Sequence, residues 1–196
     1  DQEIAEDAYH TPYIRPLVQP KFRRKKKGLT PAERGTATHL VLQYLDLQNL
    51  DVPGQVEKLR LEAKLTAEQA AAVDVPALRR FLESPLAEEM RQAETAAREY
   101  RFTVLMPARD YDPAAAEEDS ILLQGVVDCW FETPKGVTVV DFKTDFVQTE
   151  EDVAQHAELY RGQLAAYSLA LERVLEKAVT RKALYFLQAG KTVEVS

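Results

Sequence analysis

The chain has 196 residues, 45% of them hydrophobic, which suits one domain built around a single core. Its formal net charge of -7 argues against a protein that simply coats nucleic acid, because phosphate neutralisation needs an excess of Lys and Arg. With Cys129 as the only cysteine, the sequence excludes a disulfide framework, a four-cysteine zinc site and an iron-sulfur cluster within the chain.

The first segment, residues 1–29, combines prolines with a dense basic run at residues 21–27 and shows no sustained periodicity. This predicts an extended basic arm or linker ahead of a domain at residues 30–196. The basic run is either solvated chain or a phosphate-contacting arm. Because this start is charged rather than signal-like, and no run of about 18 apolar residues occurs, we expect a cytoplasmic protein with no membrane partner.

Helical signals follow the arm. Thr30-Pro31-Ala32-Glu33 is a capping box with proline at the first helical position, and apolar residues continue at helical spacing, which predicts a helix over residues 31–48. Further helix starts at Thr66 and Ser84 predict a helical stretch over residues 66–94. We expect these helices to pack as an insertion at about residues 50–95.

Strand signals dominate the second half. Alternation from Arg98 predicts a strand that stops at Pro107, before an acidic loop. Residues 121–132 and 137–143 flank a turn sequence and predict a hairpin, residues 151–176 predict a long helix, and residues 181–188 predict a strand followed by a short final one. The order predicts an α/β fold with a central mixed sheet of four to five strands flanked by helices.

The predicted hairpin brings two acids together. Counting outward from a two-residue loop at 134–135 places Asp128 opposite Asp141. Opposed residues have Cβ atoms about 5 Å apart, so two carboxylates repel there unless a cation lies between them. Strand alternation puts Lys143 on the face of Asp141 and sends Phe142 into the core. A bulge or a longer loop would shift this register and make the acids diagonal.

These residue types suit metal-assisted hydrolysis. Carboxylate oxygens favour Mg²⁺, with Mn²⁺ as a substitute, and an ammonium beside such an ion can orient or deprotonate water and offset developing charge. Any one of these side chains taken alone is more often an ordinary salt-bridged residue, so the joint arrangement carries the prediction. Cys129 should alternate away from Asp128, which disfavours a cysteine hydrolase. Gly190-Lys191-Thr192 lacks the earlier glycine of a phosphate-binding loop, so no ATP site is expected here.

Four segments resemble the motifs of the PD-(D/E)XK nucleases, in their RecB-like branch. Gly-Val-Val-Asp at 125–128 and Val-Val-Asp-Phe-Lys-Thr-Asp at 139–145 look like the core signature, Gly-Thr-Ala-Thr-His at 35–39 like the early motif, and residues 160–167 like the late Tyr-x-x-Gln-x-x-x-Tyr motif. They occur in family order over about residues 30–190. Residues 29–36 are also similar to those of the nuclease domains in the AddA family of bacterial helicase-nucleases.

The resemblance implies a restriction-endonuclease-like fold and a metal-dependent deoxyribonuclease, exonuclease or endonuclease. It assigns the metal to His39, Asp128, Asp141 and the backbone carbonyl of Phe142, with Lys143 catalytic. Residues expected to support the site or bind substrate are Glu99, Thr144, Tyr160, Gln163 and Tyr167. By themselves, a lone helical histidine is more often structural and an aromatic stripe such as Tyr160, Gln163 and Tyr167 more often belongs to a core.

The same resemblance implies DNA as substrate, delivered as single strands or ends during double-strand-break repair and recombination. It implies an AddB-like partner protein and helicase domains of the same polypeptide, where ATP would bind, outside these residues. Two alternatives remain open at this stage. One is a catalytically inactive nuclease-fold scaffold that binds DNA, against which the intact Asp128, Asp141 and Lys143 count. The other is a stand-alone recombination exonuclease.

Overall fold

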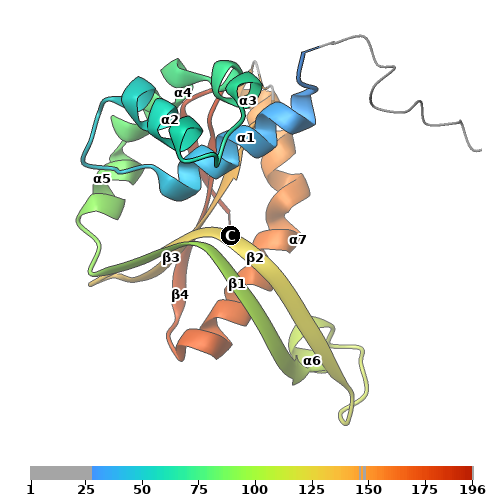
Figure 1. Cartoon of the computed structure of the whole chain (residues 1–196). Coiled ribbons are helices and arrows are strands. Elements are labelled where there is room, and N and C mark those ends of the chain that lie inside the picture. Colours follow the sequence, from blue (N-terminus) through green and yellow to red (C-terminus); the bar gives the residue numbers. More distant parts are fainter. Residues whose placement is uncertain (1–27, 146, 148, 196) are drawn as a thin grey trace, which may run out of the picture.

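A five-stranded sheet forms the centre of the structure (Figure 1). The structure is a computed structural model and describes residues 28–145, 147 and 149–195. The predicted arm at residues 1–27 lies outside the described residues. The strand order is β1-β2-β3-β4-β5. The strands are β1 (Thr95–Pro107), β2 (Ser120–Thr133), β3 (Gly136–Lys143), β4 (Val179–Phe186) and β5 (Lys191–Glu194). Only β3 and β4 pair in parallel, so the predicted mixed sheet is confirmed.

The parallel pair requires a crossover, which α7 (Glu150–Leu175) supplies. Thr149 caps this helix in a capping box with Asp152. The remaining helices are α1 (Pro31–Tyr44), α2 (Val52–Leu61), α3 (Ala67–Ala72), α4 (Val75–Leu82), α5 (Pro85–Arg91) and α6 (Ala108–Tyr111). None of the described helices is long and apolar enough to cross a membrane.

Helix α1 starts as predicted but ends earlier. The Thr30 hydroxyl accepts from Glu33 N, and the Glu33 carboxylate accepts from Thr30 N, so the capping box is present. The predicted end at residue 48 was wrong, because Leu45 adopts an extended conformation and Arg98 of β1 donates to the carbonyls of Leu42 and Leu45. These carbonyls lie at the end of the helix, where no backbone N–H remains to bind them.

Helix α2 lies within the helical insertion expected at about residues 50–95, but the sequence analysis predicted no helix start for it, although Asp51 caps it by accepting from Gly54 N and a proline lies in its first turn. The short α6 likewise occupies part of the predicted acidic loop. Both helices are brief, and their apolar positions gain a partner only in the folded chain. Val52, for example, is fully buried. Packing of its apolar side chains against the rest of the fold, rather than its own helix propensity, therefore stabilises α2.

Two cores cover the two faces of the sheet. Helices α1 to α5 pack on one face, where Phe81 makes edge contacts with Phe142 and Tyr185. Helix α7 packs on the other face, with Leu164 and Leu171 buried beside the strand residues of that side. Figure 1 shows the α1–α5 layer and α7 on either side of the strands. Fully burying such large side chains contributes roughly 1.5–3 kcal/mol each.

Strands β1 and β2 extend beyond the rest of the sheet. They pair from Thr95 with Glu132 through to Pro107 with Ser120, whereas β2 pairs with β3 only from Thr133 back to Cys129. The unpaired half of β2 therefore leaves β3 and continues with β1 as a two-stranded ribbon, which extends away from the α1–α5 layer to α6 (Figure 1). The sheet forks between β2 and β3, between Asp128 and Cys129 on one strand and between Val140 and Asp141 on the other.

Candidate active site at the fork of the sheet

The predicted hairpin register is confirmed up to the fork. Trp130 pairs with Val139, as the two-residue loop predicted, and Cys129 with Val140 forms the last pair. Asp128 and Asp141 follow on the two diverging strands. In place of a further backbone pair, the Asp128 carboxylate accepts a 2.8 Å hydrogen bond from Phe142 N. The Asp128 side chain thus replaces the backbone pairing that ends at the fork. It also binds Asp128 to β3, the strand that carries Asp141.

A change of strand face at the fork directs Asp128 toward α1. Glu99, on β1, has a left-handed backbone with φ of 50° at the level of Asp128, where the β1–β2 ladder skips a pair. A non-glycine residue in this conformation is uncommon. Val127 packs with α7, whereas Cys129 packs under α1–α5. Strict alternation would place Val127 and Cys129 on the same face of the sheet, but they lie on opposite faces. As a result, Asp128 Oδ2 lies 3.4 Å from His39 Nδ1.

This geometry corrects the expectation for Cys129. Strict alternation would place its side chain on the face opposite Asp128, but both side chains lie toward α1 because the alternation breaks at the fork. The thiol is nevertheless fully buried, and this burial, with a smaller contribution from Asp128, raises the pKa of Cys129 to about 12. A thiol of this kind is not a nucleophile at neutral pH.

Asp141 and Lys143 meet on the α7 side of β3. The Asp141 side chain is only 6% exposed, and its Oδ2 atom lies 2.6 Å from Lys143 Nζ. The ammonium also donates to Gln163 Oε1 at 3.3 Å and lies 3.4 Å from the ring centroid of Tyr160. Gln163 in turn donates through Nε2 to the Tyr167 hydroxyl at 2.8 Å. The stripe on α7 therefore orients the lysine.

Comparison with known proteins identifies the family of this chain. The family model described as the PD-(D/E)XK nuclease superfamily matches residues 8–195. The chain belongs to this superfamily. It is 38% identical to an AddA-type ATP-dependent helicase/nuclease from Acetivibrio thermocellus, over 97% of the chain and 16% of that relative. Proteins of the same description from Bacillus cytotoxicus and Heliobacterium modesticaldum are 35% and 37% identical, over 97% and 89% of the chain. The chain spans about a sixth of the length of the first of these relatives.

Burial and neighbouring charges shift the pKa values of Asp141 and His39 in this region. Burial, followed by the neighbouring charge of Asp128, raises the pKa of Asp141 from 3.8 to about 6, although Lys143 opposes the shift. Burial opposes the charged form of His39, but the hydrogen bond and charge of Asp128 outweigh it and raise the pKa of the imidazole. Two carboxylates thus share a poorly hydrated region in which positive charge is favoured.

The predicted metal ligands are near one another but not gathered. Among the residues that the structure describes, no group of three His, Cys, Asp or Glu side chains is arranged to hold a metal ion. Asp128 faces His39 and Phe142 N, whereas Asp141 faces Lys143. The residues expected to form the nuclease signature therefore lie in two groups, one on each side of β3, joined through the backbone of Phe142.

The supporting residues expected from the sequence lie around these halves. Glu99 shares a small pocket with His39 and Asp128. Thr144 lies beside Gly35, where a Cβ atom added to the glycine would be 2.9 Å from Thr144 Oγ1. Glycine at this position of the nuclease motif permits α1 to approach the end of β3.

Sequence reasoning gave no individual role to Asp145, although it follows the Asp-Phe-Lys segment closely. Its Oδ2 accepts a 3.0 Å hydrogen bond from the Tyr160 hydroxyl. Burial, followed by this hydrogen bond, raises the pKa of Tyr160. Asp145 lies two residues beyond Lys143, so the sequence places it near the site. Only the fold shows that Asp145 holds Tyr160, against whose ring Lys143 packs.

Proposed function

We propose that this nuclease domain hydrolyses phosphodiester bonds of DNA with the help of a divalent metal ion. The observation that carries the proposal is the proximity of Asp128, Asp141 and Lys143 at the fork of the sheet, with Lys143 Nζ held 2.6 Å from Asp141 and Asp128 bound to the backbone N of Phe142 between them. Two acids and an ammonium that adjoin one another across β3 suit the stabilisation of a phosphate whose charge increases during attack by water. Asp128, Asp141 and Lys143 are the proposed catalytic residues.

The donors at the fork fit Mg²⁺, with Mn²⁺ as a substitute. The buried Asp141 carboxylate has a raised pKa because its charge is poorly solvated and lies close to Asp128, and a cation would relieve both effects. The proposed ligands are Asp128, Asp141, His39 and the backbone carbonyl of Phe142, mostly hard oxygen donors of the kind these ions prefer. When bound, the ion would supply Lewis-acid stabilisation of the phosphate charge.

Lys143 is proposed to position the attacking water and to offset the negative charge on the phosphate. Its side chain is only 12% exposed and is held by Asp141, Gln163 and the Tyr160 ring, so its orientation is restricted before substrate binds. A restricted donor loses little conformational entropy during the reaction. Gln163 and Tyr167 are proposed to hold this orientation, while Thr144 and Glu99 line the approach to the site.

The wider role follows from the relatives. Their description as ATP-dependent helicase/nucleases leads us to propose that this domain works within such a complex in double-strand-break repair and recombination, in the bacterial cytoplasm. The partners would be an AddB-like protein and helicase domains of the same polypeptide, which would bind ATP. A motor that delivers single strands would compensate for the net charge of -7, which disfavours unaided DNA binding.

The test is cleavage of end-labelled linear DNA, single- and double-stranded, with Mg²⁺, Mn²⁺ or EDTA. The variants are Asp128→Asn, Asp141→Asn and Lys143→Ala. Lys177→Ala is the matched control, because Lys177 also forms a 2.6 Å ion pair, with Glu132, but outside the site. We expect metal-dependent cutting that falls at least about a hundredfold in the three site variants and is retained in the control.

Metal binding separates the alternatives. Thermal melting with and without Mn²⁺ measures binding independently of cleavage, because a ligand that binds only the folded state raises the melting temperature. Absence of both cutting and a metal-dependent shift would overturn the proposal and favour the inactive scaffold. A shift without cutting would contradict activity of the domain alone, and the assay would then be repeated with the complete helicase-nuclease and the same variants.

A further inference from the structure

Two clefts adjoin the candidate active site, one on each side of α1. The first, here called the Arg34 cleft, has a volume of about 630 Å³ and is lined by residues that include Arg34, Gly35, Thr144 and Asp145. Thr144 directly follows Lys143 in the chain, so this cleft lies beside the end of β3 that carries Lys143. It lies between the first turns of α1, the α3–α4 segment and the loop after β3.

The second cleft, here called the Arg101 cleft, has a volume of about 230 Å³. It lies between α1 and the outer face of β1, and His39, Glu99, Gln43 and Arg101 line it. His39 contacts Asp128, so this cleft opens at the other half of the site. The fork of the sheet therefore lies between the two clefts.

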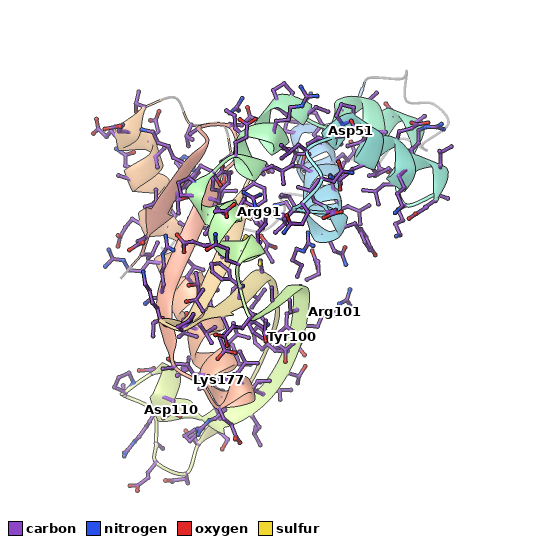
Figure 2. All side chains as sticks on the ribbon, turned by 90° about the vertical axis from the view of Figure 1, so that its left-hand side faces the viewer. Asp51, Arg91, Tyr100, Arg101, Asp110 and Lys177 are labelled. Carbon is purple, nitrogen blue, oxygen red and sulfur yellow. The ribbon has the colours of Figure 1, made fainter. Side chains whose placement is uncertain are left out.

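The change of face at Glu99 explains the position of Arg101. Tyr100 stacks edge-on with Trp130 on the α7 side, at 5.8 Å between ring centroids. Normal alternation then returns Arg101 to the side of Glu99, where it lines the cleft. Figure 2 shows the Arg101 side chain extending outward past the edge of β1. Two residues of strand, about 6.6 Å, separate it from Glu99 along the strand.

Arg34 and Arg101 differ from most cations of the described chain in their partners. Arg98 binds carbonyls of α1, Arg181 binds Glu89 and Glu194, and Lys143 binds Asp141. By contrast, within the residues that the structure describes, neither the Arg34 nor the Arg101 side chain has a hydrogen bond or an ion pair, and both are exposed. In a chain with net charge -7, two unneutralised guanidinium groups thus flank the site.

We propose that a single polynucleotide strand crosses the active site through both clefts, with Arg34 and Arg101 binding phosphates on opposite sides of the scissile bond. A guanidinium suits this task because its planar donors match phosphate oxygens and its charge is permanent. Gln43 and Thr36 in the Arg101 cleft add uncharged polar groups for sugar and base. This inference rests on the proposed nuclease function and adds the path of its substrate.

The recessed site favours a single strand over a duplex. The Asp128 and Asp141 side chains are 15% and 6% exposed. A phosphate reaches such groups when its backbone can bend into the fork, which a flexible strand does at little cost, whereas bending a duplex over a short site costs about 1–6 kcal/mol by elastic estimates. The two arginines then neutralise phosphates that approach an otherwise acidic site.

Binding of a fluorescent 20-nucleotide single strand tests the proposal without cleavage. All proteins carry Lys143→Ala, and Arg34→Gln, Arg101→Gln and the double substitution are compared by anisotropy over a range of NaCl concentrations in EDTA. The control is Lys135→Gln, which removes one positive charge at the β2–β3 turn, at the opposite end of β3 from the site. We expect each arginine variant to bind about tenfold more weakly at low salt, and the slope of log affinity against log salt to fall by about 0.7 per arginine.

The outcomes are distinguishable from those of the cleavage test. Unchanged affinity in both arginine variants, equal losses in the Lys135→Gln control, or no measurable binding by the parent at low salt would each overturn the strand path, even if the wild type cuts DNA. Equal losses for single strands and for a duplex of the same length would overturn the choice of a single strand. If the wild type does not cut but the arginine dependence is present, the strand path stands and the proposed activity fails.

A kinetic measurement in the otherwise unsubstituted chain gives a second readout. A phosphate-binding arginine acts on substrate affinity, so Arg101→Gln should raise KM about tenfold and change kcat less than about threefold. A substitution that merely disturbed the fork would lower kcat, because it would displace Asp128 or His39. A fall in kcat with KM unchanged would therefore contradict the assignment of Arg101 to substrate binding.

Discussion

Lys143 Nζ lies over the ring of Tyr160, 3.4 Å from its centroid, and the hydroxyl of this tyrosine donates to Asp145. An ammonium over an aromatic face gains about 0.5–2 kcal/mol, more where water is excluded. Because the backbone of Lys143 belongs to β3 and Tyr160 belongs to α7, this contact connects β3 to the crossover helix. It therefore makes the position of the ammonium depend on the packing of α7.

Two substitutions of Tyr160 should separate the contribution of its ring, which contacts Lys143, from that of its hydroxyl, which binds Asp145. Tyr160→Phe keeps the ring and loses only the contact with Asp145, so we expect kcat to stay within about threefold of the wild type. Tyr160→Leu removes the ring, and loss of about 1.4 kcal/mol of ammonium positioning corresponds to about a tenfold lower kcat. Steady-state cleavage kinetics measure both, with the melting temperature as a check on folding. Equal kcat for the two variants would contradict a positioning role of the ring.

The metal-free protein should lose stability as Asp141 ionises. Its folded pKa, about 6, is above its usual 3.8, so the folded state favours the protonated form. This contribution is present at low pH and is lost between about pH 4 and pH 6. At about 1.36 kcal/mol per unit the loss approaches about 3 kcal/mol. Asp141→Asn is neutral throughout, so its stability relative to the wild type should rise over that window.

Urea denaturation in EDTA at pH 4.5 and pH 7.5 measures this difference. We expect the wild type to be the less stable protein at pH 7.5 and the gap to narrow at pH 4.5. Asp110→Asn is the control, since Asp110 forms an exposed ion pair with Arg173 and should show no comparable change. A variant that is less stable than the wild type at pH 7.5 would mean that the ion pair with Lys143 outweighs the burial of Asp141.

Asp128 combines a structural contact with its proposed catalytic role, and two substitutions can separate them. Alanine leaves Phe142 N–H without its acceptor, whereas asparagine keeps an oxygen in place. Both remove the charge, so the difference between them isolates the hydrogen bond. We expect Asp128→Asn to be about 1–2 kcal/mol more stable than Asp128→Ala in urea denaturation, and both to be inactive. Equal stabilities would show that the contact does not hold the fork.

The sequence predicted the site better than its surroundings. A two-residue loop fixes the register of β2 and β3 as far as Cys129 and Val140, so it could be counted from the turn that Asp128 and Asp141 come next on the two strands. The expected direct opposition of the two carboxylates was wrong, because the strands separate at that level and Asp128 contacts His39 whereas Asp141 contacts Lys143. The fork itself could not be predicted, because it coincides with the left-handed backbone of Glu99 on β1, a conformation that a glutamate in the sequence does not signal. Strict alternation therefore placed Cys129 wrongly relative to Asp128.

Other features were missed for different reasons. Helix α2 has a cap at Asp51, and its buried residues Val52, Val56 and Leu59 have helical spacing, but a segment of 10 residues with a proline and a glycine in its first turn is a weak helix signal. Arg34 and Arg101 did not stand out in the sequence, one inside a motif and one on a strand. Two properties distinguish these arginines: each lines a cleft, and neither has a carboxylate partner among the described residues. Both properties come from the tertiary structure and not from the spacing of residues in the sequence.

The close approach of α1 to the end of β3 should appear as a coupling between Gly35 and Thr144. Alanine inside a helix is about 1 kcal/mol more favourable than glycine, but a Cβ atom at Gly35 would lie 2.9 Å from Thr144 Oγ1. Gly35→Ala should therefore give no gain, or a loss of up to about 1 kcal/mol, in the wild type. In a Thr144→Ala background, which removes Oγ1, the same substitution should stabilise by about 0.5–1 kcal/mol. Four proteins compared by urea denaturation give the coupling, and an equal effect of Gly35→Ala in both backgrounds would show that the hydroxyl does not limit the approach of the helix.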